Sequence, residues 1–345
     1  MSARSKDAQE SPGAPHPAAN AHLIGHLRAE ARMLEAARSG RMHHAWLLSG
    51  PRGIGKATLA YRFARFLLAH GAAIPQQAES LHVDESHPVF HMLAAGAHPD
   101  LATLERGIDP RTKKLRANIL VDDARKISHF LSMTAAEGGW RIVIADAADD
   151  MNPQAANAIL KILEEPPANC LFLMVSHAPG RLLPTIRSRC LHLPIRPLSE
   201  EQVREALAVV MPQLDARDIA RAAPLSRGSP GRAVQLASSR AAELFSRFLE
   251  VAQEPGARDP ALALTLAGNL AGARNADDFR LFTQLLREWM QDKARLAAAH
   301  GQAREAHRWA QLSADAAQML ARLEALNLDR RQALSALFAR AGVLT

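Results

Sequence analysis

The sequence contains only two cysteines, Cys170 and Cys190, among 345 residues. They do not form a C-x-x-C pair, so a disulfide framework and a cysteine-based zinc site are both excluded. Apolar runs are short as well, and none approaches the roughly 18 residues that a membrane-spanning helix needs. We therefore expect a cytoplasmic protein that binds no zinc and has no membrane partner.

Aromatic residues are also scarce, at 4%, although 48% of the chain is hydrophobic. This composition favours a soluble protein built largely of Ala- and Leu-rich helices, and its length suffices for two or three domains. Residues 1–20 are rich in Ala, Pro, Ser and His and carry charges where a signal peptide would be apolar. They predict a disordered leader that is dispensable.

The net charge of +7 permits a nucleic-acid partner, because basic surfaces release counterions from phosphates. The excess is spread along the chain, however. Its tightest cluster follows Asp109 and Pro110 and consists of Arg111, Lys113, Lys114 and Arg116. A solvated hairpin loop explains this cluster better than a DNA-binding site does.

An apolar segment at 45–49 runs into a glycine-rich turn and then a helical pattern, the context of a phosphate-binding loop. In the pattern G-x-x-x-x-G-K-[ST], backbone N–H groups surround the phosphates, the lysine reaches the outer phosphates and the hydroxyl binds magnesium. Ala57 replaces that hydroxyl, and Thr58 lies about 100° further around the helix. The residues predicted to contact a nucleotide here are Gly50, Pro51, Arg52, Gly53, Ile54, Gly55, Lys56, Ala57 and Thr58.

A second part of the predicted site is the apolar run 141–146, which ends in Asp146. A central parallel strand places such a carboxylate at the edge that faces the ligand. In ATPases this Asp supports magnesium, and in many AAA+ motors a following Glu polarises the attacking water. Ala147 stands at that position, so both magnesium binding and water activation lack a side chain. We predict no metal ligand and no ATP hydrolysis by this chain.

Strand and helix patterns alternate over the first two thirds of the chain, and only helical patterns follow. The predicted strands lie at 45–49, 101–104, 141–146, 170–175 and 191–193. Their alternation with helices predicts an α/β module whose parallel sheet has helices on both faces. We expect this module at 21–197, a small helical lid at 198–240 and an all-α domain at 241–345.

Three further motifs join the phosphate loop and Asp146. They are the string N-A-I-L-K-I-L-E-E-P-P at 157–167, the triplet Ser188-Arg189-Cys190 and the stretch Gly228-Ser229-Pro230-Gly231-Arg232. Together these residues resemble AAA+ subunits of the bacterial DNA polymerase III clamp loader, and most closely their non-hydrolysing stator type. The resemblance covers about residues 21–239.

This resemblance implies an AAA+ module, a helical lid and a helical collar that joins five subunits in a ring. Arg189 would reach the ATP of a neighbouring motor subunit, where its fixed charge stabilises the reacting phosphate. The alternative is that Arg189 only pairs with a local carboxylate. Arg232 would lie near the nucleotide, although Gly231 occupies the position where relatives carry the arginine.

The resemblance also implies partners: tau/gamma-type motor subunits and a delta subunit in a hetero-pentamer, the sliding clamp, and primed DNA through the assembled complex. No cofactor is required, but ATP or ADP bound without hydrolysis stays open. An active AAA+ ATPase, either a clamp-loader motor or a helicase motor, is the alternative function, because Gly50, Gly55 and Lys56 are intact.

Overall fold

The chain forms two compact units, which the computed structural model describes over residues 14–341 except 72, 137–138, 254–259, 273–275 and 327–328. One unit comprises Met1–Leu214 and Ser226–Val234, and the other comprises Asp215–Leu225 and Gln235–Thr345. The expected division into three domains does not coincide with these two units and stays a prediction.

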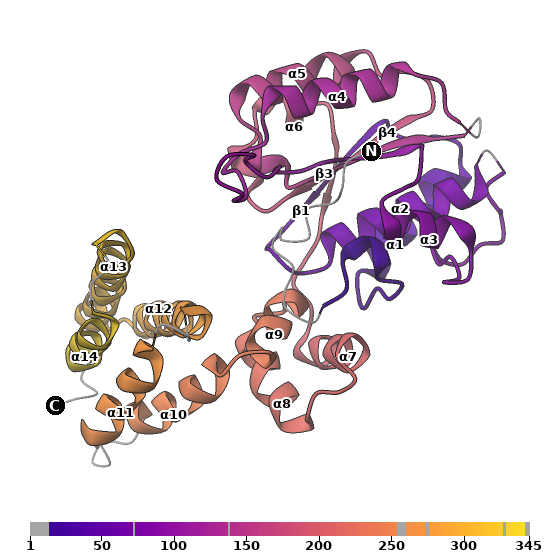
Figure 1. Ribbon diagram of the computed structural model, residues 1–345. Helices are drawn as coiled ribbons and strands as arrows, with labels where there is room; N and C mark the ends of the chain where they lie inside the picture. The colour runs from indigo at the N-terminus through magenta and orange to yellow at the C-terminus, as the bar shows by residue number, and fades with distance from the viewer. Residues whose placement is uncertain are drawn as a thin grey trace. The chain divides into compact units, whose positions relative to one another are not determined.

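A parallel sheet lies at the centre of the first unit (Figure 1). Within the described residues its strand order is β2-β3-β4-β1-β5, and every neighbouring pair is parallel. The strands are β1 (Ala45–Ser49), β2 (Leu101–Leu104), β3 (Arg141–Asp146), β4 (Cys170–Ser176) and β5 (Leu191–Pro194). All five predicted strands are confirmed, and their carboxyl ends share one edge of the sheet.

Helices cover both faces of this sheet, which confirms the predicted α/β fold (Figure 1). Strand β1 shows the cause, because successive side chains of a strand point to opposite faces. Trp46 and Leu48 belong to one hydrophobic core, and Ala45 and Leu47 to the other. The first core packs against α1 (Leu27–Arg38), α2 (Lys56–His70) and α3 (Pro88–Ala95), the second against α4 (Val121–Ser132), α5 (Pro153–Glu164) and α6 (Pro184–Arg187).

The segment before α1 is part of the folded unit. Pro17–Ala19 form a turn of 3-10 helix, and Ala18 is fully buried. Arg65 of α2 is 1% exposed and donates from Nη2 to the carbonyl of Ala18 at 2.7 Å. The expectation of disorder is therefore wrong for residues 14–20, because a buried guanidinium takes its acceptors from them. Residues 1–13 lie outside the described part.

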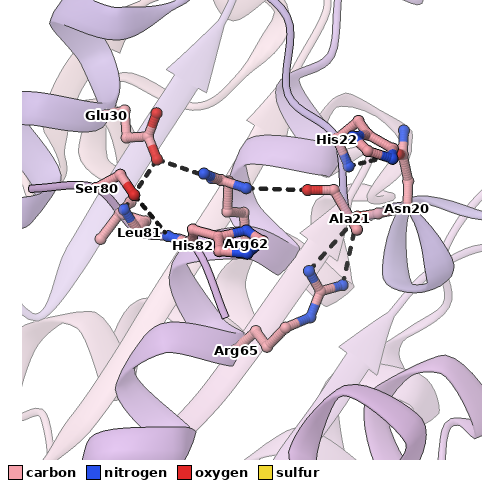
Figure 2. A network of polar contacts seen from close by, with 9 residues as sticks. All are labelled: Asn20, Ala21, His22, Glu30, Arg62, Arg65, Ser80, Leu81 and His82. Carbon is pink, nitrogen blue, oxygen red and sulfur yellow. Dashed lines mark hydrogen bonds and ion pairs between the residues drawn. The ribbon is translucent and has the colours of Figure 1, made fainter. Parts of the chain in front are cut away.

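A buried ion pair continues this attachment. Arg62 Nε lies 2.8 Å from Glu30 Oε1, and its Nη1 donates to the carbonyl of Ala21 at 2.9 Å. The same Glu30 oxygen accepts from the N–H of Leu81 at 2.9 Å. Figure 2 shows how Arg62 and Arg65, side by side on α2, connect these distant segments. Their partners hold the start of the chain on the sheet's helical layer.

The basic cluster after β2 lies on a hairpin, as predicted. Ile108 and Leu115 form an antiparallel bridge. Asp109 closes the turn, since its carboxylate accepts from the backbone N–H groups of Arg111 (2.8 Å) and Thr112 (2.9 Å). This local bonding explains why Asp and Pro precede the basic residues.

The other unit is helical in its described residues, which confirms the predicted all-α character of this part. Its helices are α8 (Ala216–Leu225), α10 (Ala241–Gln253), α11 (Pro260–Ala271), α12 (Ala276–Ala299), α13 (Ala303–Leu326) and α14 (Arg330–Arg340). Phe248 lies at the centre of an aromatic cluster with Phe245, Phe282, Trp289 and Phe338. Over the described part of the chain, every helix is too short or too polar to cross a membrane.

Candidate functional site

The phosphate loop connects β1 to α2, as its pattern requires. Gly50, Gly53 and Gly55 have φ angles of 149°, 72° and 96°, which L side chains rarely adopt. At Gly50 a Cβ would lie 2.3 Å from the carbonyl oxygen of Ile195, so only glycine fits. The loop therefore has the backbone that concave anion-binding turns use.

Lys56 is the first residue of α2 and is 3% exposed. Its Nζ donates to the loop's own carbonyls, at 2.7 Å for Gly50 and also to Pro51. Burial lowers the pKa of Lys56 to about 8, and the charges of Asp146 and Asp149 oppose that shift. The ammonium is therefore held inside the loop, close to two carboxylates.

Asp146 ends β3 at the same edge of the sheet. Burial raises the pKa of its carboxyl to about 6, although the positive charges of Lys56 and Arg52 oppose the shift. Ala147 follows and is only 5% exposed. Methyl groups at 57 and 147 thus take the positions where a hydrolytic site would have a metal-binding hydroxyl and a water-activating carboxylate.

Asp149 has a structural role that the sequence did not indicate. Its carboxylate accepts hydrogen bonds from Ser176 Oγ (2.5 Å) and from the N–H groups of His177 (2.5 Å) and Ala178 (3.1 Å). These bonds connect the turn after β3 to the end of β4. Burial and the nearby charges of Lys56 and Arg52 lower the pKa of His177 to about 4, so its imidazole is neutral at pH 7.

The start of α9 (Pro230–Ala237) lies directly on the phosphate loop. Ser229 Oγ donates to the carbonyl of Arg52 at 2.9 Å, and the N–H of Gly231 donates to the carbonyl of Gly53 at 2.9 Å. A Cβ on Gly53 would lie 2.5 Å from Ser229 Oγ and 3.3 Å from the backbone nitrogen of Arg232. The structure thus brings Arg232 to the loop, as the resemblance implied.

On another side of the loop lies His26, just before α1. Its Nε2 is 2.5 Å from the carbonyl oxygen of Ile54, and burial lowers the pKa of the imidazole. This contact gave no signal in the sequence, because a single histidine before a helix is common in loops. The predicted residues 50–58, Asp146 and Arg232 therefore lie together, with His26 added, and their roles toward a nucleotide stay predictions.

The residues present fit a phosphate group better than a magnesium ion. The glycine conformations, the buried lysine and the start of α2 are suited to an anion. Ala57 offers no ligand, and Thr58 is half-buried in the same helical turn. Among the described residues, no cluster of three or more His, Cys, Asp or Glu side chains could hold a metal ion.

Arg189 lies just after α6, and its polar contacts in the described structure are local. Its Nη2 is 2.8 Å from Glu164 Oε1, and its Nη1 donates to the carbonyl of Thr185 at 3.0 Å. The pairing with a local carboxylate that we considered as an alternative is therefore present. With 35% of the side chain exposed, Arg189 can also meet a second partner.

Comparisons with known proteins agree with the motifs. The family model described as DNA polymerase III, delta subunit, matches residues 25–199. DNA polymerase III subunit delta' of Pseudomonas aeruginosa is 36% identical over 207 residues, 60% of each chain. The Escherichia coli subunit delta' is 35% identical over 207 residues, 59% of this chain and 58% of the relative.

A third relative has a different name. DNA polymerase III subunit gamma/tau of Mycobacterium bovis is 33% identical over 197 residues, 57% of this chain and 32% of the relative. The chain spans about three fifths of the length of the two delta' relatives that it matches and about a third of the gamma/tau relative.

Proposed function

The chain belongs to the DNA polymerase III delta subunit family, and from this premise we propose that it acts as a delta' subunit of the clamp loader. In this role it is a stator that does not hydrolyse ATP and that helps to load the sliding clamp onto primed DNA during replication. The names of two relatives with 36% and 35% identity support this assignment.

The observation that carries the non-hydrolytic part is the pair of alanines at the phosphate site. Ala57 and Ala147 stand in the same site as the buried Lys56 and the half-buried Asp146. Neither alanine supplies a side-chain oxygen that could bind a metal ion or activate a water molecule. Phosphoryl transfer depends almost entirely on positioning and charge stabilisation. A loop without these two functions can hold phosphates but does not activate the attack on them.

ATP or ADP is the ligand that this loop suits, bound without turnover, and no zinc is required. The partners in this proposal are tau/gamma-type motor subunits and a delta subunit, joined in a ring of five through the helical C-terminal part. The ring acts on the sliding clamp and on primed DNA in the cytoplasm. Arg189 reaches the nucleotide of the adjacent motor subunit.

An active AAA+ ATPase is the second candidate, either a clamp-loader motor or a helicase motor. It is favoured by the 33% identity to a gamma/tau subunit and by the retained Gly50, Gly55 and Lys56. In that case Thr58 or a water molecule would have to complete the metal site in place of Ala57.

Hydrolysis of ATP by the isolated chain separates the two candidates. A stator shows no turnover above background with magnesium and primed DNA, and the Lys56→Ala variant behaves identically. In the reconstituted complex, Arg189→Ala assembles normally but lowers turnover on the order of 10³-fold at the site that it completes. Turnover by the isolated chain that is lost in Lys56→Ala would show that the protein is a motor.

A further inference from the structure

An exposed ion pair holds the arginine that the proposed function places at a neighbouring ATP site. Glu164 is the last residue of α5, and its Oε1 lies 2.8 Å from Nη2 of Arg189. Nη1 of the same guanidinium donates to the carbonyl of Thr185 at 3.0 Å. The guanidinium therefore has two short attachments, to a carboxylate and to a backbone oxygen of α6, and a longer one from Nη1 to Ser188 Oγ at 3.5 Å.

These attachments use only part of the guanidinium, which has five N–H donors in one rigid plane. Within the described residues, only Nη1 and Nη2 of Arg189 have polar partners. The side chain is also 35% exposed. The remaining N–H donors of Arg189 can therefore bind a phosphate while the bonds to Glu164 and Thr185 persist.

We propose that Glu164 is a positioning residue that orients Arg189 toward the nucleotide of the adjacent subunit. This inference rests on the proposed function and adds to it a carboxylate of this chain. A long arginine side chain loses rotamer freedom when it binds a phosphate. Glu164 and the Thr185 carbonyl remove part of that freedom before the subunits meet, so less is lost in the transition state.

The opposite role, a latch that keeps Arg189 away from the nucleotide, does not fit the exposure of the pair. Half of the Glu164 side chain is accessible, and exposed ion pairs are weak. A nucleotide's phosphates carry more negative charge than one carboxylate and can also bind the guanidinium through two parallel hydrogen bonds. Glu164 can thus favour one orientation of the Arg189 side chain but cannot keep that side chain away from the nucleotide.

The test measures kcat and KM for DNA-stimulated ATP hydrolysis by the reconstituted complex. Glu164→Ala should lower kcat about twofold to fivefold with KM unchanged, the range expected for an exposed ion pair. Glu164→Gln should recover part of the loss, because its amide oxygen still accepts a hydrogen bond. The matched control is Glu165→Ala, an exposed carboxylate one residue further along, which should leave both constants unchanged.

A double variant shows whether Glu164 acts through Arg189. In the Arg189→Ala background, Glu164→Ala should have no further effect. A rise in kcat for Glu164→Ala, or an equal loss in that background, overturns the inference while leaving the proposed function intact. Unchanged turnover in Arg189→Ala alone overturns both. If Glu164→Ala impairs assembly, as judged by gel filtration, the kcat of Glu164→Gln is used for the test instead, because glutamine preserves the size of the side chain.

Discussion

Removing residues 1–20 should destabilise the sheet-containing unit, although their composition suggests a dispensable leader. The truncation deletes two backbone acceptors of Arg65. They are the carbonyl of Ala18 and the carbonyl of Asn20, whose oxygen lies 3.5 Å from both Nη1 and Nη2 of Arg65. Hydrogen bonds to charged groups contribute about 1.5–3 kcal/mol, and burial of the Ala18 methyl about 0.8 kcal/mol. The expected cost is therefore about 2–4 kcal/mol.

The assay is thermal unfolding followed by circular dichroism, with removal of residues 1–13 as the control. For a unit of this size the loss corresponds to about 4–16 °C in Tm. Truncation at 13 leaves every described contact in place, so its Tm should match that of the full chain.

A second substitution identifies the cause of the loss. Arg65 lies over the ring of Phe90, with 4.2 Å between the guanidinium carbon and the ring centroid. Arg65→Met keeps an apolar side chain there and removes the charge, so it should recover stability in the chain truncated at 20. A truncation at 20 that melts within 1 °C of the full chain would refute the reasoning, and equal costs of Arg65→Met in both backgrounds would show that the charge is irrelevant.

Three further predictions concern the phosphate site. Folding raises the pKa of Asp146 from 3.8 to about 6, so its contribution to stability is fully present below pH 4 and is lost as the pH rises through 6. Relative to the Asp146→Asn variant, the wild type should lose about 3 kcal/mol of stability over this range, measured as a falling difference in Tm. A difference in Tm that stays constant with pH would contradict this. Gly53→Ala should lower Tm by an amount equivalent to about 1–3 kcal/mol, because φ is positive and the new Cβ would lie 2.5 Å from Ser229 Oγ. The control Gly180→Ala should leave Tm unchanged, because its Cβ would meet no atom within 4 Å. Ala57→Thr should strengthen magnesium-dependent binding of ADP, measured by calorimetry, without producing turnover, and turnover in this single variant would show that Ala147 is not limiting.

Periodicity predicted the architecture well where burial decides it. The apolar runs at 141–146 and 170–175 are strands buried on both faces, as expected for short continuous apolar runs in a parallel sheet. The hairpin after β2 and the capped start of α7 (Glu200–Val210) were also predictable from short-range bonding. Ser199 Oγ accepts from the N–H of Gln202 at 3.2 Å, the bond that a serine followed three residues later by a glutamine favours at a helix start.

Features that depend on distant partners were not predictable. Residues 14–20 look like a polar leader, and only the folded chain reveals that Arg65 needs their carbonyls. Helix α3 lies among scattered histidines and prolines, where eight residues are too few to show a period. The contact between Gly53 and Gly231 joins positions 178 residues apart, and the pairing of Arg189 with Glu164 joins two motifs that the sequence keeps separate.

The short strand β5 lies at one edge of the sheet and ends in a proline. The N–H of Ile195 donates inward to the carbonyl of Ser49 at 2.7 Å, and because donors alternate along a strand, the nitrogen of Pro194 faces the open edge. A proline nitrogen has no hydrogen, so another strand finds no donor there. An edge of four residues with one donor removed is a poor template for sheet extension by another chain.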